Sequence, residues 1–411
     1  MYPTQKKTFV AVAPICFVLA FFATSQVVAQ PTYSVDMQSA SVPGFHDSGA
    51  ILTPQGAGQV GPAATALTSP MLGILPAPGR QVPELDALSY GTEPLLQSGI
   101  GIQHYYTFSV DEFAAGRPGV PGPSVTTEGA LSPFPEAAGD IYASTVAPGP
   151  FLPFPGFNSG LYDGNGGLTP FAAPGLNLRE PTFPTVGAGD AGDNLDAWEL
   201  DQAPPPGVFG AIWLNPVYFS LDSQYADPLE APQPFNTGTA VANGFVGGDV
   251  LVTTNPGGPP VVFAPAFMLG LDKLGPDHDD LDALVLADNN DGVYTPPTGP
   301  YSWAGGATDM LLFSLRRGSA MIGQLDSLLN LPIEEGDILM PPSSPGANPG
   351  IFVPAEALGL RTVRTNGANL PFGFADELDG LDVQQVIPEP ATCVLMALGL
   401  VATFARRRRI D

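Results

Sequence analysis

Short runs of aliphatic and aromatic residues, separated by polar stretches rich in glycine and proline, fill most of the chain. Runs of this length bounded by turn residues predict strands rather than helices. The 49 glycines and 48 prolines among 411 residues interrupt any long helical periodicity. The hydrophobic pattern therefore predicts an all-β domain of short strands with many loops.

The apolar runs recur in a fixed order. The stretch GGDVLVTTNPGGPPVVFAPAFMLGL, from Gly247, aligns with GDILMPPSSPGANPGIFVPAEALGL, from Gly336, and each continues to an acidic Leu-Asp segment. Looser copies lie upstream, so that four repeats cover approximately residues 33–90, 105–200, 217–286 and 310–383. Each repeat contributes four strands in the order Leu-Asp-x-Leu, aromatic-Ser-aliphatic-Asp, Gly-Asp-aliphatic, and the Phe/Val run before Leu-Gly-Leu.

Four antiparallel strands per repeat predict a four-bladed β-propeller, with a β-sandwich or jelly roll as the alternative. The chain opens with an aromatic-Ser strand, Tyr33 to Asp36, and closes with a Leu-Asp strand, Leu378 to Val383. Pairing these two strands would complete a blade from both chain ends and remove two exposed edges. The order of the Leu-Asp and Phe-Ser motifs also resembles hemopexin-like propellers, which implies the same four-bladed ring.

Residues 1–29 have the pattern of a secretory signal peptide. Lys6 and Lys7 precede an apolar stretch, and the small residues at the first and third positions of Val27-Val28-Ala29 suit cleavage by signal peptidase after Ala29. The expected β domain then spans residues 30–386.

Residues 387–411 predict a membrane-targeting tail. Residues 391–405 are apolar and uncharged, which is short for a membrane span of about 20 residues. The basic cluster Arg406, Arg407, Arg408 and Arg409 would hold that end in the cytoplasm. A permanent C-terminal anchor is one interpretation of this transmembrane helix.

The other interpretation comes from a family resemblance. Pro388, Glu389 and Pro390, followed by the apolar helix and the arginine cluster, resemble the PEP-CTERM sorting signal. The resemblance implies recognition by an exosortase at the inner membrane of a Gram-negative-type bacterium, removal of the tail, and release to the cell surface or extracellular matrix. Ile387 and Ala391 stand where the family more often has Val and Ser or Thr.

Charge and cysteine content narrow the functional classes. Without the terminal segments the chain keeps 8 basic and 38 acidic residues, a net charge of about −30 with neutral histidines. The electrostatic field of such a negative charge repels nucleic acid and attracts cations. Cys16 and Cys393 both lie in the targeting segments, so the processed domain has no thiol and no disulfide.

One aspartate recurs in every Leu-Asp strand: Asp86, Asp196, Asp282 and Asp379. A ring would bring these residues around one axis, where carboxylates could hold Ca²⁺. Alternatively, each aspartate caps a turn or binds the adjacent backbone.

We expect a non-enzymatic surface or matrix protein that contacts polysaccharide or other surface proteins. A secreted carbohydrate hydrolase with a carboxylate pair in the axial cavity is the alternative.

Overall fold

The computed structural model describes residues 29–42, 47–54, 62–76, 84–90, 104–111, 114–120, 122–129, 137–146, 158–166, 175–179, 193–200, 216–222, 238–253, 258–289, 291–370 and 373–385. All of them belong to one compact unit, Ala29–Val386. The second unit consists of segments 1–28 and 387–411, which lie outside the described residues.

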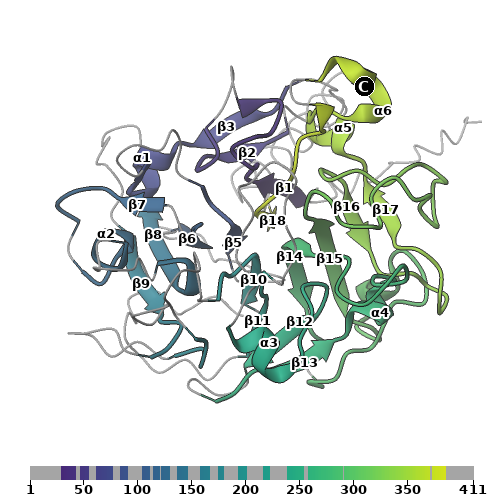
Figure 1. The fold of residues 1–411 in the computed structure, drawn as a ribbon, viewed down its shortest axis with the longest axis horizontal. Helices are drawn as coiled ribbons and strands as arrows, with labels where there is room; N and C mark the ends of the chain where they lie inside the picture. Colours follow the sequence, from purple (N-terminus) through teal and green to yellow (C-terminus); the bar gives the residue numbers. More distant parts are fainter. Residues whose placement is uncertain are drawn as a thin grey trace, which may run out of the picture. The chain divides into compact units, whose positions relative to one another are not determined.

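Four antiparallel sheets of four strands each form a four-bladed β-propeller (Figure 1). This confirms the predicted ring, and the sandwich alternative is wrong. Numbered from the innermost strand outward, blade 1 consists of β18 (Leu381–Gln385), β1 (Ala29–Tyr33), β2 (Ile51–Thr53) and β3 (Ala64–Leu67). Blade 2 consists of β5 (Ala87–Ser89), β6 (His104–Ser109), β8 (Ile141–Val146) and β9 (Asn158–Tyr162).

Blades 3 and 4 repeat the same strand order. Blade 3 consists of β10 (Ala197–Leu200), β11 (Val217–Ser220), β12 (Val250–Thr253) and β13 (Val261–Ala264). Blade 4 consists of β14 (Leu281–Ala287), β15 (Met310–Leu315), β16 (Ile338–Met340) and β17 (Gly350–Val353). The innermost strands of all four blades carry the predicted Leu-Asp motif or directly follow it.

The two ends of the described domain close the ring. β1 pairs antiparallel with β18 from Ala29 opposite Gln385 to Tyr33 opposite Leu381. The predicted strand Tyr33 to Asp36 ends earlier than expected, at Tyr33. The Ser34 amide still donates to the Gly380 carbonyl at 2.9 Å. The backbone then turns after Asp36, whose carbonyl accepts from the Ser39 amide at 2.9 Å and whose carboxylate accepts from the Gln38 amide at 2.8 Å.

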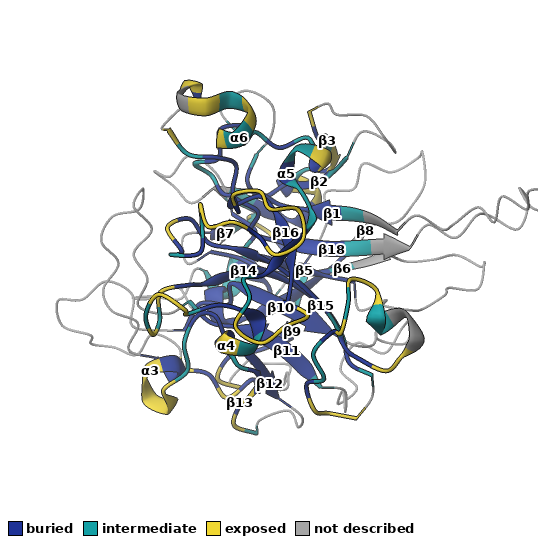
Figure 2. Ribbon diagram, turned by 90° about the vertical axis from the view of Figure 1, so that its right-hand side faces the viewer, coloured by how far each residue is buried: buried dark blue, intermediate teal, exposed yellow. Residues whose placement is uncertain are grey.

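Hydrophobic residues from neighbouring blades pack together into four clusters, one at each blade interface. Trp198 and Phe219 of blade 3, for example, pack with Ile141 of blade 2, and Tyr33 of blade 1 packs with Ile338 of blade 4. Buried residues therefore run along the inner strands, whereas exposed residues lie on the peripheral turns (Figure 2). Since each blade buries both faces, its strands need apolar residues on both sides.

Short helical turns follow the outermost strands of three blades. They are α1 (Ser69–Leu72), α4 (Ala266–Leu269) and α5 (Ala355–Leu358), and each ends at a left-handed glycine: Gly73, Gly270 or Gly359. This glycine is the centre of the recurring apolar-Gly-apolar motif. The remaining elements are β4 (Ile74–Pro76) paired with β7 (Ala114–Gly116), α2 (Val125–Glu128), α3 (Thr239–Asn243), α6 (Val363–Asn366), and the 3-10 turns η2 (Ala137–Gly139), η3 (Ser302–Gly305) and η4 (Gly367–Asn369).

Candidate functional site

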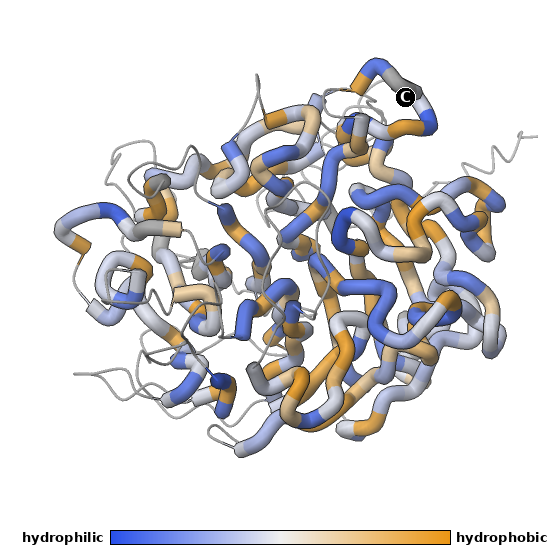
Figure 3. Tube along the Cα trace, in the orientation of Figure 1, coloured by the Kyte–Doolittle hydropathy of each residue, from blue (hydrophilic) through white to orange (hydrophobic). Residues whose placement is uncertain are grey.

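The four inner strands bring the recurring Leu-Asp aspartates to one place on the axis. Asp86 and Asp196 directly precede β5 and β10, Asp282 is the second residue of β14, and Asp379 lies two residues before β18. All four line one cavity of about 30 Å³, which we call the axial cavity. Hydrophilic stretches of the trace consequently lie at the centre of the ring among hydrophobic strand residues (Figure 3).

Two further sets of polar residues, which the sequence analysis missed, surround the same point. One set lies two positions before each Leu-Asp aspartate: Glu84, Asn194, Asp280 and Glu377. The other lies two positions after each recurring serine: Asp36, Asp111, Asp222 and Arg316. Their constant offset within the repeats is the signal that could have revealed them.

The recurring serines hold the blades together. The buried Oγ atoms of Ser34, Ser109, Ser220 and Ser314 donate to the carbonyls of Leu85, Leu195, Leu281 and Leu378, at 2.9, 2.9, 3.5 and 2.7 Å respectively. Each bond joins the end of the second strand of one blade, or the residue after it, to a residue at or shortly before the innermost strand of the next blade. The four bonds therefore complete a ring. This contact explains why serine recurs in every repeat.

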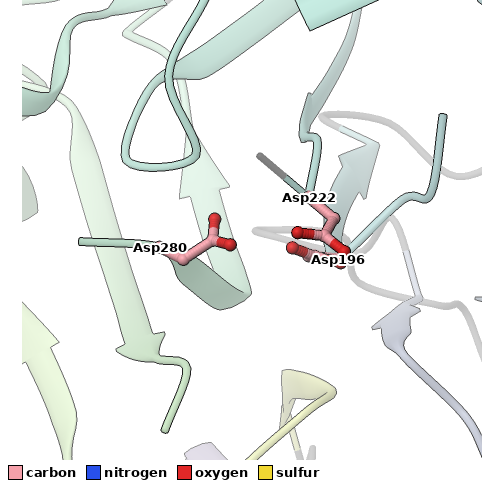
Figure 4. Close-up of side chains that lie close together, drawn as sticks. All are labelled: Asp196, Asp222 and Asp280. Carbon is pink, nitrogen blue, oxygen red and sulfur yellow. The ribbon is translucent and has the colours of Figure 1, made fainter. Parts of the chain in front are cut away.

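Arg316 neutralises one part of the axial site. Its Nη1 lies 2.8 Å from Asp222 Oδ1, 3.8 Å from Asp280 Oδ2 and 4.0 Å from Asp196 Oδ2. Asp196 and Asp222 lie next to each other and Asp280 faces them (Figure 4). We call these three aspartates the Arg316 cluster.

A second group of carboxylates lies where blade 4 meets blade 1. Asp282, Glu377 and Asp379 each offer one oxygen atom, and these atoms lie within 4.8 Å of one another. We call this group the seam cluster. Glu377 Oε2 is 2.9 Å from Arg317 Nη2, and Arg317 Nη1 is also 3.1 Å from Asp36 Oδ1. One buried guanidinium is thus shared between two carboxylates at the edge of the seam cluster.

Burial alters the acidity of the axial carboxyl groups. It raises the pKa values of Glu84, Asp196, Asp282 and Asp379 well above their ordinary range. Neighbouring carboxylates raise these pKa values further, whereas the charge of Arg316 lowers those of Asp196 and Asp282. The physical cause is the cost of holding several negative charges together away from water.

Fold and site together define a four-bladed β-propeller whose axis is lined with carboxylates. The family model described as the PEP-CTERM protein-sorting motif matches residues 386–409. The motif indicates an exported protein that an exosortase sorts through a membrane-anchored intermediate to the surface. Among curated proteins and solved structures, none matches the chain.

The residues of this motif, Pro388, Glu389, Pro390 and Arg406 to Arg409, lie outside the described residues. In the described part of the chain, no helix is long and apolar enough to cross a membrane. Ala29, the predicted last residue of the signal peptide, is the first residue of β1. Cleavage after Ala29 would leave Gln30 to Tyr33 to pair with β18.

Proposed function

We propose that the protein is a structural or binding component of the cell surface or extracellular matrix, and that the propeller is a scaffold rather than a catalyst. Signal peptidase would remove the segment before Gln30, and an exosortase would cut at the Pro388-Glu389-Pro390 motif. The strong negative charge and the glycine- and proline-rich connections suit contacts with polysaccharide or with other surface proteins.

The size of the axial cavity carries this proposal. Pockets that bind small molecules usually have volumes of about 300–1,000 Å³. The axial cavity measures about 30 Å³, and Arg316 and carboxylate side chains line it. A cavity of this size accommodates an ion or a few water molecules and excludes a sugar ring.

The close carboxylates of the seam cluster favour the hydrolase alternative. Retaining glycosidases place two carboxyl groups about 5 Å apart, and oxygen atoms of Asp282 and Asp379 lie within 4.8 Å. To compare the two functions, the purified protein would be incubated with extracellular polysaccharide from cells that produce it. We expect co-sedimentation without release of reducing ends; release that disappears in Asp282→Asn would support the hydrolase instead.

The sorting step is tested by replacing Pro388, Glu389 and Pro390 with alanine in the full-length chain. We expect the variant to stay in the membrane fraction at its unprocessed mass, because the exosortase no longer recognises it. Ile387→Val is the matched control, since it changes an adjacent residue to the one more usual in the family and should leave processing intact. Fractionation with immunoblotting gives the readout. Normal processing of the triple variant would contradict the proposal.

A further inference from the structure

The axial site is electrostatically divided. Of its twelve positions ten are carboxylates, one is Asn194 and one is Arg316. The Arg316 guanidinium contacts the three aspartates of the Arg316 cluster, so that cluster already has its cation. Arg317 is matched by Asp36 and Glu377. Neither arginine forms an ion pair with Asp282 or Asp379 among the described residues.

Asp282 and Asp379 each have a buried oxygen whose bonding capacity is unused. Their side chains line the axial cavity, and the residues are 8% and 5% exposed. Within the described part of the chain, Oδ2 of each residue is buried and has no hydrogen-bond partner. A buried carboxylate oxygen without a partner is costly, so these two oxygen atoms point to a missing positive ligand.

The spacing of the seam cluster fits one ion. Two oxygen atoms bound to Ca²⁺ at about 2.4 Å lie at most about 4.8 Å apart, and the three seam-cluster oxygens lie within that distance of one another. A donor set made of oxygen alone suits a hard cation. Mg²⁺ requires shorter bonds in a stricter octahedron and keeps several waters, for which a cavity of about 30 Å³ leaves little room.

We propose that Asp282, Glu377 and Asp379 bind one Ca²⁺ ion in the axial cavity, and that this ion stabilises the seam between blades 4 and 1. Asp282 belongs to β14, the innermost strand of blade 4, whereas Glu377 and Asp379 lie on the segment that leads into the ring-closing strand β18. Ca²⁺ takes six to eight oxygen ligands, so carboxylates of the seam cluster that bind through both oxygens and waters in the cavity would supply the rest. Glu377 remains a ligand while bonded to Arg317, because each carboxylate oxygen accepts more than one partner. This site is independent of the sorting pathway and of the proposed surface function.

Equilibrium dialysis of the full-length chain in detergent against Ca²⁺, followed by atomic emission, tests the binding. We expect one bound Ca²⁺ per chain, lost in the double variant Asp282→Asn and Asp379→Asn. Asp196→Asn is the matched control, because it changes the same repeat position beside Arg316, and it should retain the ion. The proposal is wrong if the wild type binds no Ca²⁺, if the double variant binds as well as the wild type, or if Asp196→Asn loses the ion too.

Thermal unfolding distinguishes a bound ion from a purely structural role of the carboxylates. An ion that binds only the folded state should raise Tm by about 2 °C for each tenfold increase in free Ca²⁺ above its dissociation constant. Mg²⁺ at the same concentration should have a smaller effect. In chelator, the double variant should be at least as stable as the wild type, because neutral amides avoid the cost of burying carboxylates beside one another. A chelator-treated variant that melts well below the wild type, or a wild-type Tm insensitive to Ca²⁺, would overturn the proposal.

Discussion

Arg316 occupies the position that carries an aspartate in the other three blades. If this position also held an aspartate, all twelve axial positions except Asn194 would be acidic. The arginine places a positive charge 2.8 Å from Asp222 and within 4.0 Å of Asp196. One substitution thus makes a fourfold acidic ring asymmetric, because it places a cation beside Asp196, Asp222 and Asp280 and leaves Asp282 and Asp379 without one among the described residues.

Glu199 of β10 is another buried acid on an innermost strand. It is fully buried and its Oε1 accepts from the Leu200 amide at 2.8 Å and from Ser89 Oγ. Burial raises the pKa of Glu199 well above its ordinary value of 4.5, and the negative charge of Asp382 raises it further. The folded state therefore keeps this proton at pH values where the unfolded chain loses it, which lowers stability as the pH rises above 4.5.

Replacing Glu199 with glutamine should remove this pH dependence. We expect Glu199→Gln to be close to the wild type in free energy of unfolding near pH 4. As the pH rises, the variant should gain stability relative to the wild type by up to about 1.4 kcal/mol per pH unit, until the pH passes the raised pKa of Glu199 in the folded wild type. Urea unfolding of both proteins from pH 4 to 8 measures the difference. A difference that stays constant over this range would contradict the assignment.

At the scale of the elements, the Ser-to-Leu hydrogen bonds couple each blade to the next. Ser109→Ala should leave the buried Leu195 carbonyl without its donor and cost about 1–3 kcal/mol in free energy of unfolding. Ser343→Ala, at an exposed position, is the control and should change stability by less than about 0.5 kcal/mol. Denaturant unfolding of both variants provides the comparison. Equal effects at the two sites would argue against a coupling role.

Strand order and ring closure were predictable because each strand type carries its own local motif, such as Leu-Asp or Phe-Ser. The helical turns α1, α4 and α5 were not predicted, because four residues are too few to show a helical period. The sequence feature that marks each helical turn is the left-handed glycine at which the turn ends.

The candidate site was only partly predictable. The four Leu-Asp aspartates converge on the axis because the repeat places them at the same position in every blade. The partners of Arg316 could not be inferred in the same way, since Asp196, Asp222 and Asp280 come from separate segments that only the folded ring brings together. Acidic residues also occur in exposed turns, such as Asp291, so composition alone does not separate the site from a solvated turn.

At the scale of the whole domain, closure by β1 and β18 can be locked covalently. Pro31 lies opposite Val383, and antiparallel partners have Cα atoms about 4.5–5.5 Å apart, a distance that a disulfide spans. The double variant Pro31→Cys and Val383→Cys should form a disulfide and gain up to about 5 kcal/mol, because the bond closes a very long loop in the unfolded chain. Thiol titration and melting with and without reductant check this. Free thiols under oxidising conditions would show that the pair is not adjacent.

The closing ladder also imposes an order of events on export. β1 crosses the membrane among the first residues of the domain, and its partner β18 crosses among the last. Throughout translocation the edge of β1 that later pairs with β18 is open to strands of other chains, which is a route to aggregation.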